Sequence, residues 1–462
     1  MDHKSIYISA LEPHSGSLNM AIGFMEMLKG TYAKVAFFRP IISSQKERDN
    51  DIDFMLTHFE LNMSYDQCCG FAVSDYIEAY GTDQESKLYE ALIHKVNQLK
   101  QTYDFILIEG YPRTVFGSVF DFDINLEIAK NLDTAFIPIL NARDKPAQSI
   151  IDALQIVSEA VSAEGCILLA TIVNRCSPNV REAINTSLAS NQTDEQIYVF
   201  PEVKELDSPT LAQVIKTLNA QMLLGNASQL QHLVHGKKIA AMGVENYLSH
   251  IKNGDIVIVP GDRVDIILAS ILSFYAKNHS NIVALILSGG IRLSQPTIAL
   301  LQDFSTPVIP IFSVQSDSYQ TAIAIEKIST KITPQNKRKI TLSKGLFDAN
   351  IDKAKLLEHF INTSNDTLTP MMFQYRLFEQ AKSDRQKIIL PESNDERILQ
   401  ATEILIHRDI VDVILLGNPK KIHQQALKMD IDISKLKSLI PKMKVCKRNL
   451  PNFFMKCEKI KD

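Results

Sequence analysis

The chain has 462 residues, of which 45% are hydrophobic and 22% are charged, and its formal net charge is -4. Because one hydrophobic core rarely serves so long a chain, we expect three domains. The small net charge excludes the strongly basic surface that is typical of nucleic-acid-binding proteins, and it gives no field that would attract an anionic membrane.

Further sequence features indicate a cytoplasmic protein without a metal site. No apolar run approaches the roughly eighteen residues that a membrane span requires. The polar residues 1–4 lead directly into an apolar run, which leaves no room for a signal peptide. The six cysteines include no Cys-x-x-Cys pair and no Cys/His cluster with zinc spacing. We therefore predict reduced thiols, no metal, no membrane contact and a cytoplasmic location.

The first predicted domain, residues 1–230, alternates short apolar runs with helical patterns. Continuous apolar strands separated by helices favour a parallel sheet that is covered on both faces. The runs occupy residues 6–8, 35–38, 105–108, 134–137, 167–170 and 198–200. Most of them end near a turn former or a charged residue, at Arg39-Pro40, Glu109-Gly110, Asn141, Asn174-Arg175 and Pro201-Glu202.

The order of these signals resembles the dethiobiotin-synthetase-like fold of P-loop proteins. In that fold the first strand leads into a loop of pattern G-x-x-x-x-G-K-[S/T], whose amides and lysine hold phosphates. Here only Gly16 remains, because Leu11 replaces the first glycine, Ser17 the lysine and Leu18 the hydroxyl residue. Glu12 adds a negative charge where a phosphate would lie. We therefore expect no ATP turnover and predict an allosteric or assembly module.

Glu109 follows the third apolar run, where folds of this kind often place a carboxylate that faces a ligand. A turn that ends the strand explains the same residue equally well. Both interpretations stay open from the sequence.

The second predicted domain, residues 231–361, again alternates strands and helices and carries two turn motifs. Gly261-Asp262-Arg263 and Ser288-Gly289-Gly290 together resemble the DRTGG module, with serine in place of threonine. Asp262 is expected to cap the following helix, and the glycine pair permits a backbone turn that side chains would block. Gly261, Asp262, Arg263, Gly289 and Gly290 are thus candidates for holding a small anion. Two plain turns at one end of a sheet are the alternative.

Residues 362–370 are polar and predict a linker, and residues 371–437 predict the start of a third domain. An amphipathic helix over 371–382 precedes an apolar strand at 388–390, a helix that Asn394-Asp395 can cap, and a second strand at 413–416. This stretch resembles the opening of the doubly wound α/β catalytic domain of phosphate acetyltransferases. Glu392, Asn394 and Arg397 are the candidate catalytic residues, although Arg397 also fits a solvated surface position.

The composition changes near the end of the chain. Residues 435–462 contain nine Lys or Arg and two acidic residues, without helical or strand periodicity. We expect an interrupted catalytic domain followed by an atypical basic tail, residues 438–462, of non-native coding origin. A functional basic tail that binds RNA or an acidic partner is the alternative.

The order of the three parts resembles the long bacterial form of phosphate acetyltransferases. The resemblance implies a homo-oligomer that converts acetyl-CoA and phosphate into acetyl phosphate and CoA in acetate metabolism, with CoA as a substrate and no bound cofactor. We expect the truncation to impair this activity. A non-enzymatic regulatory or scaffold protein that binds a metabolite or a partner subunit is the second hypothesis. An ATP-dependent ligase similar to dethiobiotin synthetase is opposed by Leu11, Ser17 and Leu18.

Overall fold

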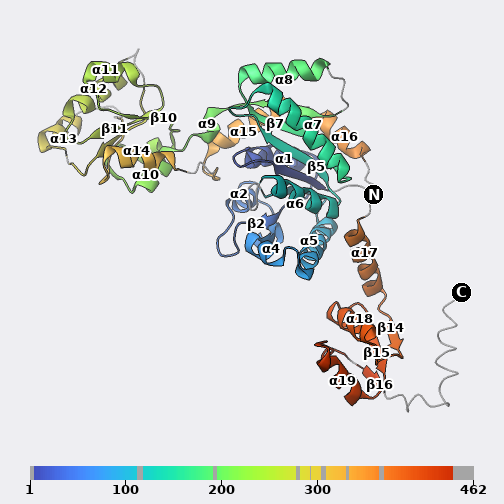
Figure 1. Cartoon of the computed structure of the whole chain (residues 1–462). Helices are drawn as coiled ribbons and strands as arrows, with labels where there is room; N and C mark the ends of the chain where they lie inside the picture. The colour runs from blue at the N-terminus through green and yellow to red at the C-terminus, as the bar shows by residue number, and fades with distance from the viewer. Residues whose placement is uncertain are drawn as a thin grey trace, which may run out of the picture. The chain divides into compact units, whose positions relative to one another are not determined.

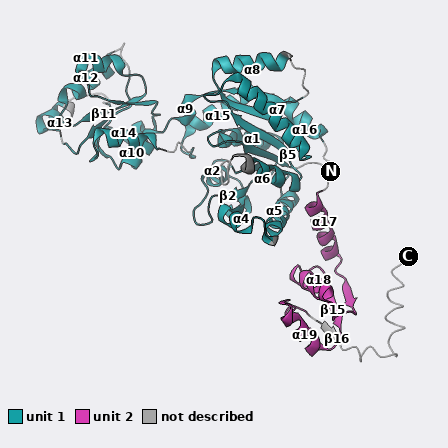
Figure 2. Cartoon of the chain, viewed as in Figure 1, with its two compact units in different colours: residues 1–365 teal, residues 366–462 magenta. Residues whose placement is uncertain are grey.

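The computed structural model describes residues 5–111, 118–190, 195–276, 281–291, 293–302, 309–328, 332–363, 369–436 and 438–440. The chain divides into two compact units, residues 1–365 and 366–462 (Figure 2). The first unit contains two sheets and the second unit contains one, and helices follow most strands (Figure 1). The predicted multidomain α/β class is confirmed. No helix among the described residues is long and apolar enough to span a membrane.

The first sheet has eight strands in the order β3-β2-β4-β1-β5-β7-β8, with β6 paired to β5, and all its pairings are parallel. Its central strands are buried along their whole length, as parallel strands between two helical layers must be. The strands are β1 (Ser5–Ala10), β2 (Val35–Ile42), β3 (Cys69–Ala72), β4 (Phe105–Glu109), β5 (Ala135–Asn141), β6 (Ile167–Leu168), β7 (Thr171–Cys176) and β8 (Ile197–Pro201).

Helices from two separate parts of the sequence cover this sheet. The first part supplies α1 (Ser17–Thr31), α2 (Asn50–His58), α3 (Tyr65–Cys68), α4 (Val73–Ala79), α5 (Asp83–Thr102), α6 (Ser118–Asn131), α7 (Ala147–Ala163), α8 (Pro178–Ser190) and α9 (Lys204–Asp207). The second part supplies α15 (Lys337–Asn350) and α16 (Lys353–Asn362). Phe347 of α15 and Phe360 of α16 are buried in the same core as Phe24 of α1 and Phe105 of β4.

The second sheet has five strands in the order β10-β11-β12-β13-β9, and β9 is antiparallel to its neighbour. The strands are β9 (Gln221–Leu224), β10 (Gly236–Ile239), β11 (Asp255–Pro260), β12 (Ala284–Ser288) and β13 (Ile311–Ser313). Two cores flank the sheet, one with α11 (Val244–His250) and α12 (Val264–Tyr275), the other with α10 (Leu211–Leu218) and α14 (Ser318–Glu326). The 3-10 helix η1 (Ala227–Gln231) and α13 (Gln295–Gln302) complete this part.

The packing differs from the predicted boundaries at residues 230 and 361. Helix α10 and strand β9 precede residue 230 but pack with the second sheet. Helices α15 and α16 lie in the segment predicted as the second domain but pack on the first sheet. An amphipathic helix carries an apolar face without indicating which sheet that face will cover, so its assignment needs the tertiary structure.

The second unit holds a three-stranded parallel sheet in the order β14-β15-β16. Its elements are α17 (Pro370–Ser383), β14 (Lys387–Leu390), α18 (Glu396–His407), β15 (Asp412–Leu416), α19 (Pro419–Lys428) and β16 (Ser438–Ile440). The helices and strands predicted from 371 to 416 therefore form. Strand β16 occupies the first three residues of the predicted tail, and residues 441–462 lie outside the described residues, as do residues 364–368 of the predicted linker.

The return of α15 to α1 can be tested at Gly23. A Cβ atom on Gly23 would lie 2.2 Å from the ring of Phe347, whereas a Cβ on Gly30 of the same helix would meet nothing within 4 Å. We expect Gly23→Ala to destabilise the chain by about 1–3 kcal/mol through overpacking. Gly30→Ala should be neutral or stabilising by up to about 1 kcal/mol. Urea denaturation followed by circular dichroism measures the free energy of unfolding of both variants. Equal changes in this free energy would show that α15 does not pack against α1 at Gly23.

Candidate functional site

The polar residues at the strand ends gather at the carboxyl edge of the first sheet. Because β1, β4, β5 and β7 are parallel, their carboxyl ends meet at one edge. Glu109 is the last residue of β4 and Asn141 the last of β5, while Asn174 lies in β7. In open α/β sheets this edge is where ligands bind.

The loop between β1 and α1 is held in place by the chain's own groups. Gly16 adopts a left-handed conformation with φ 84° and is the N-cap of α1. Asn174 Nδ2 donates to the carbonyl oxygen of Ser15 at 2.8 Å, and Ser15 Oγ donates to the carbonyl oxygen of Glu12 at 2.6 Å. The carboxylate of Glu12 pairs with the ammonium group of Lys145. The negative charge that the sequence placed at a phosphate position is therefore already neutralised.

A buried arginine connects this edge to the loop that follows β2. Arg39 Nη1 donates to Asp49 Oδ1 at 2.7 Å and to Asp51 Oδ2 at 2.8 Å. Its Nε lies 3.8 Å from Glu109 Oε2, and its side chain is 4% exposed. Asp49 also caps α2 by accepting from the amides of Asp51 and Ile52. Arg39 thus fixes the loop, the start of α2 and the end of β4 at once.

Glu109 is fully buried. Burial raises the pKa of its carboxyl group to about 8, although Arg39 opposes the shift, and the nearby Asp51 adds to it. Neither of its carboxyl oxygens accepts a hydrogen bond of normal geometry within the described residues. At neutral pH the group is therefore mostly protonated.

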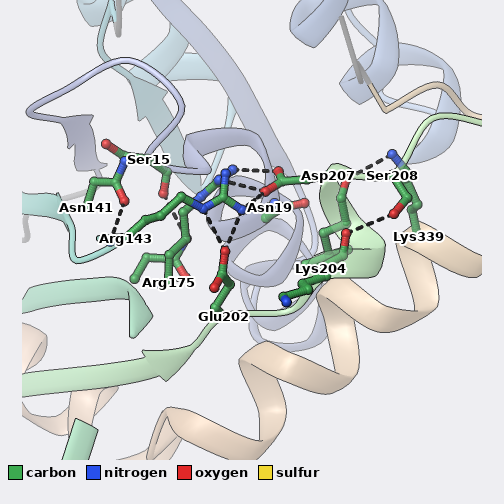
Figure 3. Close-up of polar contacts among 12 residues, drawn as sticks. Ser15, Asn19, Asn141, Arg143, Arg175, Glu202, Lys204, Asp207, Ser208 and Lys339 are labelled. Carbon is green, nitrogen blue, oxygen red and sulfur yellow. Dashed lines mark hydrogen bonds and ion pairs between the residues drawn. The ribbon is translucent and has the colours of Figure 1, made fainter. Parts of the chain in front are cut away.

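A second charged network joins the ends of β5, β7 and β8 to α9 (Figure 3). Arg175 donates through both Nη atoms to the two carboxylate oxygens of Asp207, each at 2.7 Å. Arg143 Nε donates to Glu202 Oε1 at 2.6 Å, and Arg143 also pairs with Asp207. Arg175 has φ 65°, a conformation that non-glycine residues rarely adopt and that often occurs at functional sites.

The buried Lys339 of α15 attaches this network to the returning helix. Its Nζ donates to the carbonyl oxygen of Leu206 at 2.9 Å. Burial lowers the pKa of its ammonium group to about 8, against an opposing effect of Asp207. The position of α9 therefore depends on residues about 130 positions away in the sequence.

A cavity of about 630 Å³ opens beside these networks. Its wall includes residues 13–19 of the loop and the start of α1, residues 47–51 after β2, and the side chains of Arg39, Tyr111 and Arg175. Basic residues in the wall (Arg39, Arg48, Arg175 and Lys327) are balanced by acidic ones (Glu47, Asp49, Asp51, Asp207 and Glu326). Such a mixed lining suits a small polar ligand better than a polyphosphate.

The candidate residues of the second domain form two turns that pack against each other. A Cβ on Gly261 would lie 2.3 Å from the carbonyl oxygen of Ile291, which explains the need for glycine there. Gly289 and Gly290 have φ 81° and 66°. Their amides donate to the carbonyl oxygens of Ser316 and Val314. Because internal carbonyls take both amides, the turn interpretation fits these two positions better than an anion site.

The predicted cap at Asp262 is wrong. The N-cap of α12 is Arg263, which makes no side-chain capping bond. The amide of Val264 donates to the backbone oxygen of Asp262, so the turn continues one residue further before the helix begins. Arg263 is held by Asp265 in the first helical turn, at 2.9 and 2.8 Å. A binding role for Asp262 and Arg263 stays a prediction.

The candidate residues of the second unit lie around the start of α18. Asp395 caps this helix by accepting from the amide of Arg397 at 2.9 Å, as expected for the predicted cap. Arg397 pairs with Asp395, and its side chain is 87% exposed. The carbonyl oxygen of Asn394 accepts from Gln425 at 2.7 Å, and Glu392 is exposed. A catalytic role for Glu392, Asn394 and Arg397 remains a prediction.

The sequence analysis did not identify the residue that holds the turn between β14 and α18. Ser393 is buried, and its hydroxyl donates to the carbonyl oxygen of Leu416 at 2.7 Å. A Cβ on Gly417 would lie 2.4 Å from the same hydroxyl oxygen. The glycine after the second strand was the available signal, since it marks a close approach.

Family models match three successive parts of the chain. An AAA domain matches residues 4–224, a DRTGG domain residues 213–328, and a phosphate acetyl/butaryl transferase domain residues 372–462. The third match includes the segment predicted as a basic tail. The first two matches overlap at α10 and β9, the elements that precede residue 230 yet pack with the second sheet.

Curated relatives carry one common name. The chain is 34% identical over 446 residues to a phosphate acetyltransferase of Nitratidesulfovibrio vulgaris, which covers 95% of this chain and 63% of the relative. It is 30% identical over 449 residues to that of Synechocystis sp., covering 95% and 64%. The Escherichia coli enzyme is 22% identical over 445 residues, covering 90% and 61%. The chain is therefore a relative of phosphate acetyltransferases, as predicted, and spans somewhat less than two thirds of their length.

The protonation of Glu109 predicts a pH-dependent stability. Its pKa is about 8 in the folded chain and about 4.3 when unfolded. Between these values the folded chain binds a proton that the unfolded chain lacks, so the free energy of unfolding falls as pH rises. Glu109→Gln removes this contribution. We expect the unsubstituted chain to lose stability relative to the variant from pH 5 to pH 8.

Urea midpoints at several pH values measure the effect. Glu78→Gln, at an exposed position of α4, is the matched control and should follow the unsubstituted chain at every pH. Parallel curves for Glu109→Gln and the unsubstituted chain would contradict a protonated Glu109.

Proposed function

We propose that the protein is a phosphate acetyltransferase, which converts acetyl-CoA and phosphate into acetyl phosphate and CoA. The observation that carries the proposal is the 34% identity over 446 residues to an enzyme of that name, together with the matching order of three domains. Coenzyme A is then a substrate, and the chemistry needs no metal. We further propose a cytoplasmic homo-oligomer that serves acetate metabolism.

In this reaction a phosphate oxygen attacks the thioester carbonyl carbon, the carbon–sulfur bond breaks, and the leaving thiolate takes up a proton. Cationic or backbone donors must stabilise the phosphate and the developing oxyanion. Arg397 lies in the first turn of α18, close to the carboxyl end of β14. Its present partner is the single carboxylate of Asp395, so we propose that it can turn to a substrate phosphate.

A regulatory role is the second candidate function. The cavity of about 630 Å³ at the carboxyl edge of the first sheet favours it, because the surrounding loop is ordered by internal contacts and leaves space for a ligand. In this alternative the first domain binds a metabolite, or the chain acts as a non-enzymatic scaffold for a partner subunit.

Acetyl transfer is measured directly. Purified protein with acetyl-CoA and phosphate should release free thiol and form acetyl phosphate, whereas omission of phosphate should abolish both. A rate no higher than that of heat-denatured protein would contradict the transferase proposal for this chain. Retained metabolite binding in the same inactive preparation would then favour the regulatory candidate.

A further inference from the structure

We propose that the free edge of β14, together with the adjoining apolar face of the second unit's sheet, is a docking surface for further strands and helices of a transferase domain. The occupant is the part of a phosphate acetyltransferase that has no counterpart in this chain. More than a third of each of the three relatives described above lies in that part. The proposal rests on the proposed transferase function and names a partner for it.

The helices that follow β14 and β15 cover one face of this sheet. Val413 and Leu415 of β15 are buried in a core that contains Leu399 of α18 and Ile422 of α19. Leu390 of β14 packs against the same core. Both helices therefore lie on the same face, as right-handed connections that advance in one direction along a parallel sheet require.

The opposite face of the sheet is apolar and incompletely covered. Because side chains alternate between the two faces of a strand, Ile389, Ile414 and Leu416 point away from the core that α18 and α19 form. All three are half-buried, and none of them belongs to that core, whereas Val413 and Leu415 are 4% and 0% exposed. Parallel sheets occur almost only with both faces covered. The face of Ile389, Ile414 and Leu416 therefore predicts a further helical layer.

The edge of β14 is open as well. Among the described strands β14 pairs with β15 alone, and it lies at the end of the sheet order. Ile388 is 37% exposed, although its register partner Val413 is buried. An edge strand presents a row of backbone groups that can pair with another strand. In a doubly wound sheet the first strand lies in the interior, because the fourth strand pairs with its other side.

A transferase segment fits this surface better than a second copy of the chain. The order β14-β15-β16 is the 3-2-1 half of a doubly wound sheet, so a parallel fourth strand is what the edge of β14 accepts. Two copies that joined through β14 about a two-fold axis would pair antiparallel instead. The transferase family model begins at residue 372, within α17, and so includes all three strands.

Coexpression tests the proposal. The full chain carries an affinity tag and is produced together with the unmatched part of the phosphate acetyltransferase of Nitratidesulfovibrio vulgaris. Because the two polypeptides fold together, neither part of the transferase domain has to be stable alone. We expect them to copurify in equal amounts, as measured by native mass spectrometry.

Two substitutions place a charge on the docking surface. Ile389→Lys and Ile414→Lys would each bury an unpaired ammonium group in the complex, so the copurified amount should fall at least about tenfold. Ile404→Lys is the matched control, because Ile404 of α18 is 52% exposed and lies outside the core of the unit. It should leave the copurified amount unchanged. Thermal unfolding of each variant distinguishes a folding defect from a lost surface.

Hydrogen exchange of the unsubstituted chain needs no variant. The outward amides of β14 should exchange at least about tenfold more slowly in the complex than in the chain alone, because a new strand takes them as donors. The amides of α12, in the other unit, should exchange at the same rate in both samples.

Three results overturn the proposal. One is the absence of copurification, and another is copurification that both Ile389→Lys and Ile414→Lys leave unchanged. The third is a dimer of the chain alone that both substitutions dissociate, which would show that a second copy occupies the surface. Acetyl transfer by the complex is assayed separately. A stable but inactive complex would contradict the transferase function and still support the docking surface.

Discussion

The carboxyl edge of the first sheet depends on one buried guanidinium group. Arg39 binds Asp49 and Asp51, so it compensates the carboxylates of a loop and a helix start, and it approaches the carboxyl group of Glu109 at the end of β4. Charges buried at this depth are tolerated only when they are paired. The loop after β2, the start of α2 and the wall of the cavity therefore all rely on the same side chain.

This arrangement replaces what a nucleotide would supply in a P-loop protein. The loop before α1 has lost its lysine and its first glycine, and Asn174 and Lys145 hold it from inside the chain instead. A domain that is ordered without nucleotide is free to use the same edge for a different ligand. The regulatory role proposed for the first domain is consistent with this arrangement.

The sequence predicted those features that depend on residues close together in the chain, namely the strands and a helix cap. Continuous apolar runs predicted the parallel strands. The pair Asn394-Asp395 was predicted to cap α18, and Asp395 does so, because capping needs only neighbouring residues. The return of Phe347 to α1 and the grouping of Arg39 with Glu109 join residues far apart in the sequence, and no single-sequence pattern encodes such pairings. Asp262 was wrongly expected to cap α12, because a backbone turn there moves the cap to Arg263.

Replacement of Arg39 by methionine tests the central claim most directly. The substitution keeps the length and much of the volume but leaves Asp49 and Asp51 without their cation, so urea denaturation should show a loss of about 3–5 kcal/mol. Arg338→Met removes an arginine whose ion pair with Glu205 leaves its side chain 68% exposed, and it should cost less than about 1 kcal/mol. Equally small losses for the two variants would contradict the dependence of this edge on Arg39.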